Sequence, residues 1–160
     1  MTLRIRAGEP TDVPLIAELI RALAQYERLE REVTMTEEKL DRALFGPRPY
    51  AETLIAEDGG GKAVGFALFF HNFSTFLAQP GIYLEDLFVL PEHRGAGIGR
   101  ALLERLAQIA VERGCGRMEW AVLDWNESAI KFYERLGARP NSDWTIYRLT
   151  GEPLRAVAGK

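Results

Sequence analysis

Two adjacent carboxylates, Glu85 and Asp86, interrupt an otherwise apolar run from Ile82 to Leu90. Neighbouring side chains of a β-strand point to opposite faces, so one carboxylate is expected in or near the core. Burying a carboxylate costs several kcal/mol unless it is paired or hydrogen-bonded. Two interpretations therefore stay open: an edge or bulge at which both side chains are partly solvated, or one carboxylate that faces a cleft and acts as a general base.

A glycine-rich turn, Arg94–Gly99, follows this run after a break at Pro91. Apolar residues then recur at steps of three and four, which predicts a helix as far as Ala110. Backbone N–H groups at the start of a helix are unpaired and partly positive, and glycine lets a ligand approach them closely. The segment can therefore hold a phosphate or diphosphate, although a tight turn without a ligand has the same composition. Neither the Rossmann nor the Walker spacing fits, because the glycines are at 95, 97 and 99 and Arg100 follows.

A second candidate for chemistry is Tyr133, in the stretch from Leu123 to Ala138. Asn126 is a suitable N-cap for a helix that ends at Gly137. The residues at helical spacing on one face are Ala129, Phe132, Tyr133 and Leu136. Taken alone, Tyr133 fits a packed aromatic side chain better than an acid.

These two stretches together resemble the GNAT superfamily of N-acetyltransferases. Arg94, Gly97 and Gly99 match the acyl-CoA loop R/Q-x-x-G-x-G/A, and the helix from Asn126 matches N-x-x-A-x-x-F-Y-x-x-x-G-F/A. Over nearly its whole length the chain is similar to the diamine/polyamine branch, the spermidine/spermine N-acetyltransferases. It is also similar to their relatives that acetylate thialysine or ornithine.

The segment His71–Leu77 fits the thialysine- and ornithine-type relatives better. The polyamine enzymes carry an Asp-Pro-Trp element in this region, and Thr75-Phe76-Leu77 stands here instead. Loss of one carboxylate from a cation site should weaken recognition of one ammonium group. We therefore expect a short cationic amine as the acceptor rather than a long polycation.

The resemblance implies direct attack of an amine on acetyl-CoA, with Glu85 accepting the amine proton through a water and Tyr133 protonating the CoA thiolate. A phenol with a pKa near 10 can donate to a thiolate with a pKa near 8.5 at a modest penalty. The residues expected to bind acetyl-CoA are Leu87, Phe88, Val89, Arg94, Gly95, Ala96, Gly97, Ile98, Gly99, Arg100, Asn126, Ser128, Ala129 and Tyr133. Those expected to bind the amine are Tyr26, Glu27, Glu85, Glu119, Trp120 and Asp143.

The elements that must position these residues alternate along the chain as β-α-α-β-β-β-α-β-α-β, which predicts an α/β fold. We expect strands at 3–6, 53–57, 63–70, 82–90, 117–123 and 144–149, and an irregular aromatic segment at 71–77. Thr34 or Thr36 is expected to cap the second helix. The resemblance implies a GNAT fold whose mixed sheet of about six to seven strands is splayed between its fourth and fifth strands. Helices are expected on both faces, and residues 1–160 are expected to form one domain.

Composition excludes several classes of function. The net charge of −3 gives no reason to expect a nucleic-acid partner. A single cysteine, Cys115, excludes an intrachain disulfide. Apolar runs are too short for a membrane span and the N-terminus has no signal-like apolar region, so a cytoplasmic protein is expected. No metal is expected, and a homodimer is implied by the resemblance alone.

Two rival functions remain at this stage. A protein or peptide N-acetyltransferase would need an open groove, whereas the aromatic segment 71–77 favours a closed pocket for a small molecule. A non-catalytic sensor would bind acetyl-CoA without turnover, and the presence of both Glu85 and Tyr133 argues against it.

Overall fold

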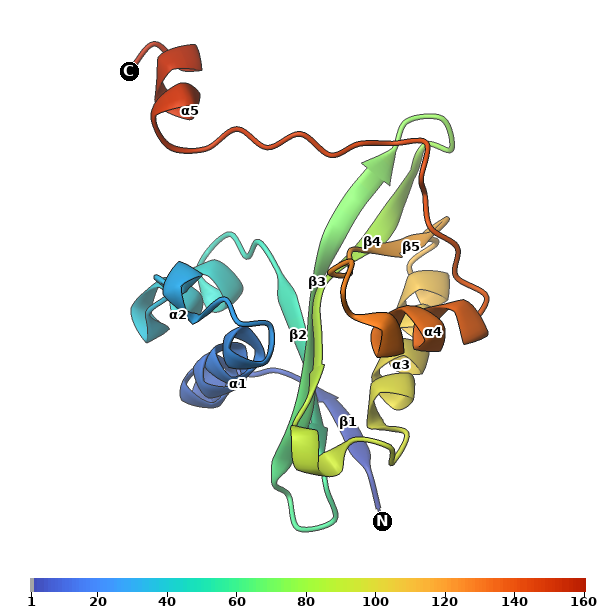
Figure 1. The fold of residues 1–160 in the computed structure, drawn as a ribbon. Coiled ribbons are helices and arrows are strands. Elements are labelled where there is room, and N and C mark those ends of the chain that lie inside the picture. The colour runs from blue at the N-terminus through green and yellow to red at the C-terminus, as the bar shows by residue number, and fades with distance from the viewer. Residues whose placement is uncertain (1) are drawn as a thin grey trace. The chain divides into compact units, whose positions relative to one another are not determined.

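The computed structural model describes residues 2–160, and the chain divides into two compact units, Met1–Ala121 and Val122–Lys160. The first unit holds one five-stranded sheet in the order β1-β2-β3-β4-β5 (Figure 1). The strands are β1 (Arg4–Ala7), β2 (Glu52–Glu57), β3 (Ala63–Ser74), β4 (Gln79–Val89) and β5 (Met118–Trp120). Successive strands pair antiparallel except β4 and β5, which are parallel. The mixed sheet is confirmed, but the expected count of six to seven strands is wrong.

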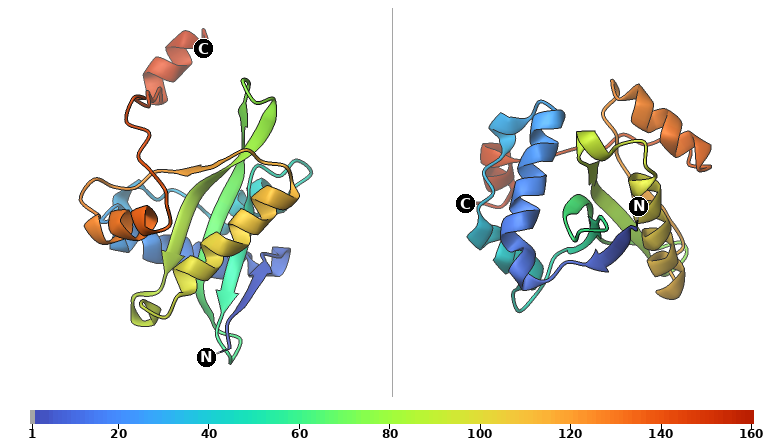
Figure 2. Two further views of the ribbon diagram at one scale, coloured as in Figure 1. Left: turned by 90° about the vertical axis from the view of Figure 1, so that its right-hand side faces the viewer. Right: turned by 90° about the horizontal axis from the view of Figure 1, so that it is seen from below.

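Helices cover both faces of this sheet, as predicted (Figure 2, right). On one face lie α1 (Val13–Tyr26) and α2 (Glu37–Phe45), whose buried side chains share a core with Ile55, Phe66 and Phe88. On the other lies α3 (Ile98–Glu112), which contacts β3 and β4. Its buried residues are Ile98, Leu102, Leu103, Leu106, Ile109 and Ala110. Each fully buried aliphatic side chain of this kind contributes about 1.5–3 kcal/mol, so the two apolar layers hold the sheet in place.

Three short 3₁₀ turns join these elements: η1 (Pro10–Asp12), η2 (Glu30–Glu32) and η3 (Pro91–His93). The predicted helix start at Thr34 or Thr36 is resolved in favour of Thr36, whose side chain accepts a hydrogen bond from the Lys39 N–H at 3.1 Å. None of the helices in residues 2–160 is long and apolar enough to cross a membrane.

The aromatic segment 71–77 is not an irregular pocket wall. Residues 71–74 continue β3, and the following turn leads directly into β4 at Gln79, so the segment forms one end of a β-hairpin. Phe76 at the turn is fully exposed. Sequence alone missed this arrangement because an aromatic-rich strand end and an aromatic loop have the same composition.

The second unit contains two helices, α4 (Glu127–Arg135) and α5 (Gly151–Val157). The predicted strand at 144–149 is wrong: this stretch is extended chain with exposed apolar side chains, including Trp144 and Tyr147. The residues have strand-like composition, but a strand needs a neighbour for its N–H and C=O groups and residues 122–160 contain no other strand. The predicted strand at 117–123 is likewise reduced to the three residues that pair with β4.

Candidate active site

A β-bulge at Glu85 decides which way the two adjacent carboxylates point. Leu68 of β3 pairs with Asp86, whereas the next residue, Phe69, pairs with Leu84, so Glu85 is the extra residue in β4. Phe69 lies under the Arg113 guanidinium at the end of α3, at 5.9 Å, which puts Leu84 on the α3 face. The bulge shifts the alternation of β4 by one residue beyond this point.

As a consequence, Asp86 faces the α1 side of the sheet. Phe88, two residues further on, belongs to the core beneath α1 and α2, and Leu68 opposite Asp86 packs against the same core. Asp86 is partly buried there, whereas the bulged Glu85 is exposed. Each of the two interpretations left open by the sequence is therefore partly right. The position is a β-bulge, and one of the two carboxylates, Asp86, still points toward the protein interior.

Glu27, Glu85 and Asp86 form a carboxylate cluster whose charges repel one another. Burial, the charge of Glu85 and the charge of Glu27 raise the pKa of Asp86 to about 7. Burial also raises the pKa of Glu27, which follows the last residue of α1. None of the ion pairs among residues 2–160 includes these three side chains. A cation placed beside them would relieve the repulsion and lower the pKa of Asp86.

Tyr83 and Glu119 lie next to this cluster, because they are register partners on β4 and β5. Burial, followed by the charges of Glu85 and Glu119, raises the pKa of the Tyr83 phenol. Glu119 Oε1 accepts a hydrogen bond from Asn72 Nδ2 at 3.1 Å and lies 3.0 Å from Arg117 Nε. Its charge is partly neutralised within the fold, so it is a weaker cation ligand than Asp86.

The glycine-rich turn has the backbone geometry of an anion cradle. Gly95 and Gly97 have φ of +83° and +80°, a conformation that residues with a Cβ rarely adopt, and open space surrounds the position of a Cβ at each. Gly97 is the N-cap of α3, and the helix has neither a side-chain cap nor an acidic residue in its first turn. Its first N–H groups are thus left for a ligand. Of the other residues predicted here, Ile98 is buried and Arg100 pairs with Glu104 at 2.8 Å.

The edge of β4 beside β5 is open next to this turn. Pairing of the two strands covers Ile82 to Leu84 only, so in the first unit the stretch from Glu85 to Val89 has a strand neighbour on the β3 side alone. This is the splay predicted between the fourth and fifth strands. It leaves backbone groups of Leu87 and Val89 without a strand partner, as a ligand lying along that edge requires. The backbone of Phe88 instead faces β3, because the Leu90 N–H two residues further on donates to the Val64 carbonyl oxygen at 2.9 Å.

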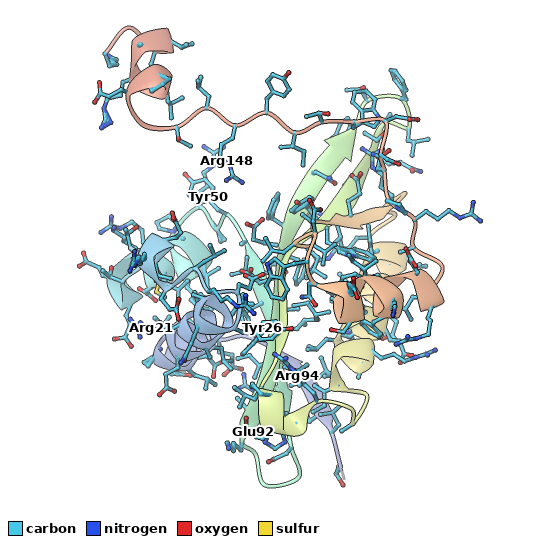
Figure 3. All side chains as sticks on the ribbon, in the orientation of Figure 1. Arg21, Tyr26, Tyr50, Glu92, Arg94 and Arg148 are labelled. Atoms are coloured by element: carbon cyan, nitrogen blue, oxygen red, sulfur yellow. The ribbon has the colours of Figure 1, made fainter. Side chains whose placement is uncertain are left out.

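Arg94 joins the turn to α1. Its Nε donates a hydrogen bond to the Val89 carbonyl oxygen at 3.1 Å, and its guanidinium lies 4.1 Å from the centre of the Tyr26 ring (Figure 3). The Phe88 ring is also near, at 5.6 Å from the guanidinium and 6.3 Å from the Tyr26 ring. The first unit thus brings together residues predicted for the coenzyme and residues predicted for the amine.

The remaining predicted residues, apart from Trp120, belong to the second unit. Asn126 caps α4, since its Oδ1 accepts hydrogen bonds from the Ala129 N–H and from Ser128 Oγ, both at 3.3 Å. Tyr133 is partly buried on the same helix, with its ring centre 5.5 Å from that of Phe132. Asp143 is exposed in the extended stretch that follows. In β5 of the first unit, Trp120 is partly buried and pairs with Leu84.

Sequence reasoning missed Asp86 as a site residue. The choice between two neighbouring carboxylates depends on the side to which each points, and the bulge that determines this arises from the pairing with β3. The only signal in the sequence was the doublet of acidic residues inside an apolar strand. No group of three or more potential metal ligands occurs among residues 2–160.

Comparisons with known proteins agree with these features. The Acetyltransferase (GNAT) family matches residues 16–138, a range that contains both predicted signatures. The chain is 39% identical to thialysine N-epsilon-acetyltransferase of Sus scrofa, over 98% of this chain and 97% of that protein. It is 35% identical to L-ornithine N5-acetyltransferase of Arabidopsis thaliana, over 96% of this chain and 87% of that protein.

Among solved structures, an integron cassette protein from the mobile metagenome of V. cholerae has a TM-score of 0.83 at 27% identity, with 100% of this chain and 99% of that chain covered. The predicted resemblance to thialysine- and ornithine-acetylating relatives is confirmed by the sequence matches. The chain therefore belongs to the GNAT family and is an N-acetyltransferase.

Proposed function

We propose that this enzyme transfers the acetyl group of acetyl-CoA to a primary amine of a small cationic molecule, such as thialysine, ornithine, a lysine-like amine or a short diamine. The observation that carries the proposal is the carboxylate cluster of Glu27, Glu85 and Asp86, which has no ion-pair partner among residues 2–160. Burial, together with the charges of Glu85 and Glu27, raises the pKa of Asp86 to about 7. Relatives named for thialysine and ornithine, both amine substrates with a second charged group, support this class of acceptor.

The coenzyme would be held by two features of the first unit. The uncapped start of α3 and the glycines before it offer N–H groups to the diphosphate. The open edge of β4, at Leu87 and Val89, would offer backbone groups to the pantetheine arm and the thioester oxygen, an oxyanion-hole role. Asn126, Ser128 and Ala129 at the start of α4 would complete the coenzyme site.

The amine needs help to lose its proton before it attacks. With a pKa near 10.4, only about one molecule in a few thousand is the free amine at pH 7. Glu85, exposed at the bulge, would take this proton through a water, and Asp86 with Glu27 would bind the cationic part of the acceptor. The amine nitrogen then bonds to the acetyl carbon, the carbon–sulfur bond breaks, and Tyr133 gives its phenolic proton to the CoA thiolate. The nitrogen loses its second proton to solvent water to become the amide, and the Tyr133 phenolate takes a proton back from solvent.

We further propose that residues 1–160 work as one acetyltransferase domain, because the family match spans both compact units. A homodimer is proposed as well, since apolar side chains such as Trp144 and Ile146 of the second unit are exposed. Light scattering coupled to size-exclusion chromatography measures the mass and tests this. Cytoplasmic location remains a proposal from the sequence.

The roles of Glu85 and Tyr133 are tested by measuring acetyl transfer from acetyl-CoA to ornithine, with the release of the CoA thiol as the readout. Loss of a general acid or base typically costs about 10²–10⁴-fold in rate, so Glu85→Gln and Tyr133→Phe should each lose kcat in this range. Arg42→Gln is the matched control, because Arg42 forms an exposed pair with Glu38. Variants that keep near-wild-type kcat would show that the two assignments are wrong.

A peptide acceptor is a second candidate, and one observation favours it. The aromatic segment expected to close the pocket is an exposed hairpin end with Phe76 fully accessible. A panel of lysine-containing peptides assayed beside free ornithine separates the two functions. We expect free amines to have the higher kcat/KM, and faster turnover of the peptides would overturn the small-molecule proposal.

A further inference from the structure

Arg94 occupies a position between two parts of the proposed site. It is the first residue of the glycine-rich turn, yet its side chain turns back onto Tyr26, the last residue of α1 (Figure 3). We use "Arg94 stack" for Arg94, Tyr26 and Phe88, whose guanidinium and rings lie within 4.1–6.3 Å of one another. The Nε bond to the Val89 carbonyl fixes the guanidinium at the end of β4.

The guanidinium uses its face and its edge differently. A face placed over an aromatic ring within about 6 Å is attracted by the ring quadrupole. The planar edge carries five N–H donors, and for Arg94 only Nε has a hydrogen-bond partner among residues 2–160. Stacking on Tyr26 therefore leaves the two Nη groups available for an anion such as a diphosphate.

The turn needs such an anchor because its own residues give it little support. Gly95 and Gly97 have no neighbour within 4 Å of a Cβ position, so side-chain packing does not fix the loop there. At the other end of the stack, Glu27 directly follows Tyr26 as the C-cap of α1, and its charge adds to burial and to the charge of Glu85 in raising the pKa of Asp86. An ordered Tyr26 ring therefore also orders the backbone that carries Glu27.

We propose that Arg94 is a positioning residue that couples coenzyme binding to amine binding through Tyr26. This inference rests on the proposed function and adds a property to it: each substrate strengthens the binding of the other. Such coupling is reciprocal by thermodynamic necessity, and factors of about 5–150 are typical. The structure offers a specific carrier, because one cation contacts a residue of each half-site.

Isothermal calorimetry of CoA binding, with and without saturating ornithine, tests the coupling. Tyr26→Leu removes the ring face and should raise the Kd of CoA about 5- to 10-fold, the size expected for one lost cation–π contact. In this variant, saturating ornithine should no longer change the Kd of CoA. Tyr26→Phe keeps the ring, so its Kd for CoA should stay within about twofold of the wild-type value.

A double mutant separates coupling from two independent losses. Tyr26→Leu combined with Arg94→Gln should bind CoA no more weakly than Arg94→Gln alone, because the second change removes a contact that is already gone. Arg94→Lys keeps the positive charge but removes the planar guanidinium that stacks on Tyr26. If the two sites are coupled, this change in the coenzyme loop should also raise the KM for ornithine. Tyr50→Leu is the matched control, since Tyr50 is 71% exposed (Figure 3).

The outcomes distinguish the coupling from the proposed function. If Tyr26→Leu raises only the KM for ornithine, leaves the Kd of CoA unchanged, and combines additively with Arg94→Gln, the coupling is overturned while the acetyltransferase proposal stands. If the wild-type protein neither binds CoA nor acetylates an amine, both are overturned. Should Tyr26→Leu fail to fold, Arg94→Lys replaces it as the test. A raised KM for ornithine in Arg94→Lys supports the coupling, and an unchanged KM overturns it.

Discussion

Two groups of acidic residues in the first unit behave in opposite ways. In the paired group, Asp12 accepts two hydrogen bonds from Arg6, at 2.7 and 2.9 Å, and Glu57 accepts one at 2.6 Å. The Arg6 guanidinium holds the pKa of Asp12 below its usual value. In the carboxylate cluster of Glu27, Glu85 and Asp86, burial and like charges raise the pKa of Asp86 to about 7.

The difference shows what each group does for the protein. Asp12 is buried, and its hydrogen bonds to Arg6 tie the start of α1 to β1, so the paired group supports the fold. The carboxylate cluster opposes folding whenever it is ionised, because it places negative charges together without a cation. Such a cost is expected where a site keeps charge for a ligand. Substitutions in the two groups should therefore change stability in opposite directions.

The largest stability effect is expected from Asp86→Asn. With a pKa of about 7 in the folded protein and near 3.9 unfolded, the native state holds more protons between these pH values, so stability falls as pH rises through this interval. Removal of the charge should raise the free energy of unfolding at pH 8 by at most about 4 kcal/mol. Urea unfolding at pH 4 and pH 8 measures it.

The gain from Asp86→Asn should shrink toward zero at pH 4, where wild-type Asp86 is already neutral. A variant that is less stable than wild type at pH 8 would mean that the Asp86 carboxylate is compensated within the fold, and the contrast with Asp12 would disappear.

Asp12→Asn should act in the opposite direction. Loss of a charged partner of Arg6 is expected to lower the free energy of unfolding at pH 7 by about 1–3 kcal/mol. Because the pKa of Asp12 is lowered in the folded protein, its contribution is present above its ordinary pKa and is lost as pH falls below about 4. Thermal unfolding across pH 3–8 measures the difference, and an equal loss at pH 3 and pH 7 would contradict it.

Glu27→Gln should sharpen the view of the cluster. Removing one like charge lowers the pKa of Asp86, which nuclear magnetic resonance of the carboxyl carbon can follow, with Asp86→Asn to assign the signal. The KM for ornithine should rise about 3- to 10-fold as one cation ligand is lost. A titration midpoint of Asp86 that does not move would show that Glu27 contributes nothing to the cluster.

The smallest effect is expected at an exposed ion pair outside both groups. Glu38→Gln breaks the contact with Arg42 at 3.1 Å on α2 and should change the free energy of unfolding by less than about 0.5 kcal/mol. Urea unfolding measures it beside Asp12→Asn. A loss as large as that of Asp12→Asn would mean that burial is not what separates the paired group from ordinary surface pairs.

The sequence predicted those features whose signals are local. The helix after the glycine turn follows from apolar spacing and the caps at Thr36 and Asn126 from residue type, and the structure contains all three. The bulge at Glu85 could not be predicted, since it depends on which residue of β3 lies opposite. For the same reason the role of Asp86, the Arg94 stack and the unpaired stretch 144–149 required the tertiary structure.

The most direct test compares two acceptors of equal length, 1,5-diaminopentane and 5-aminopentan-1-ol, with acetyl-CoA and release of the CoA thiol as the readout. Each can present a primary amine to the thioester, but only the diamine then still carries a second cation for Asp86 and Glu27; its two equivalent amines account for at most a factor of two. We expect kcat/KM to be at least about tenfold higher for the diamine, the size of one charged hydrogen bond, and this preference to vanish in Asp86→Asn. Equal kcat/KM for the two acceptors in the wild-type enzyme, or a preference that survives Asp86→Asn, would contradict the claim that the carboxylate cluster recognises the acceptor.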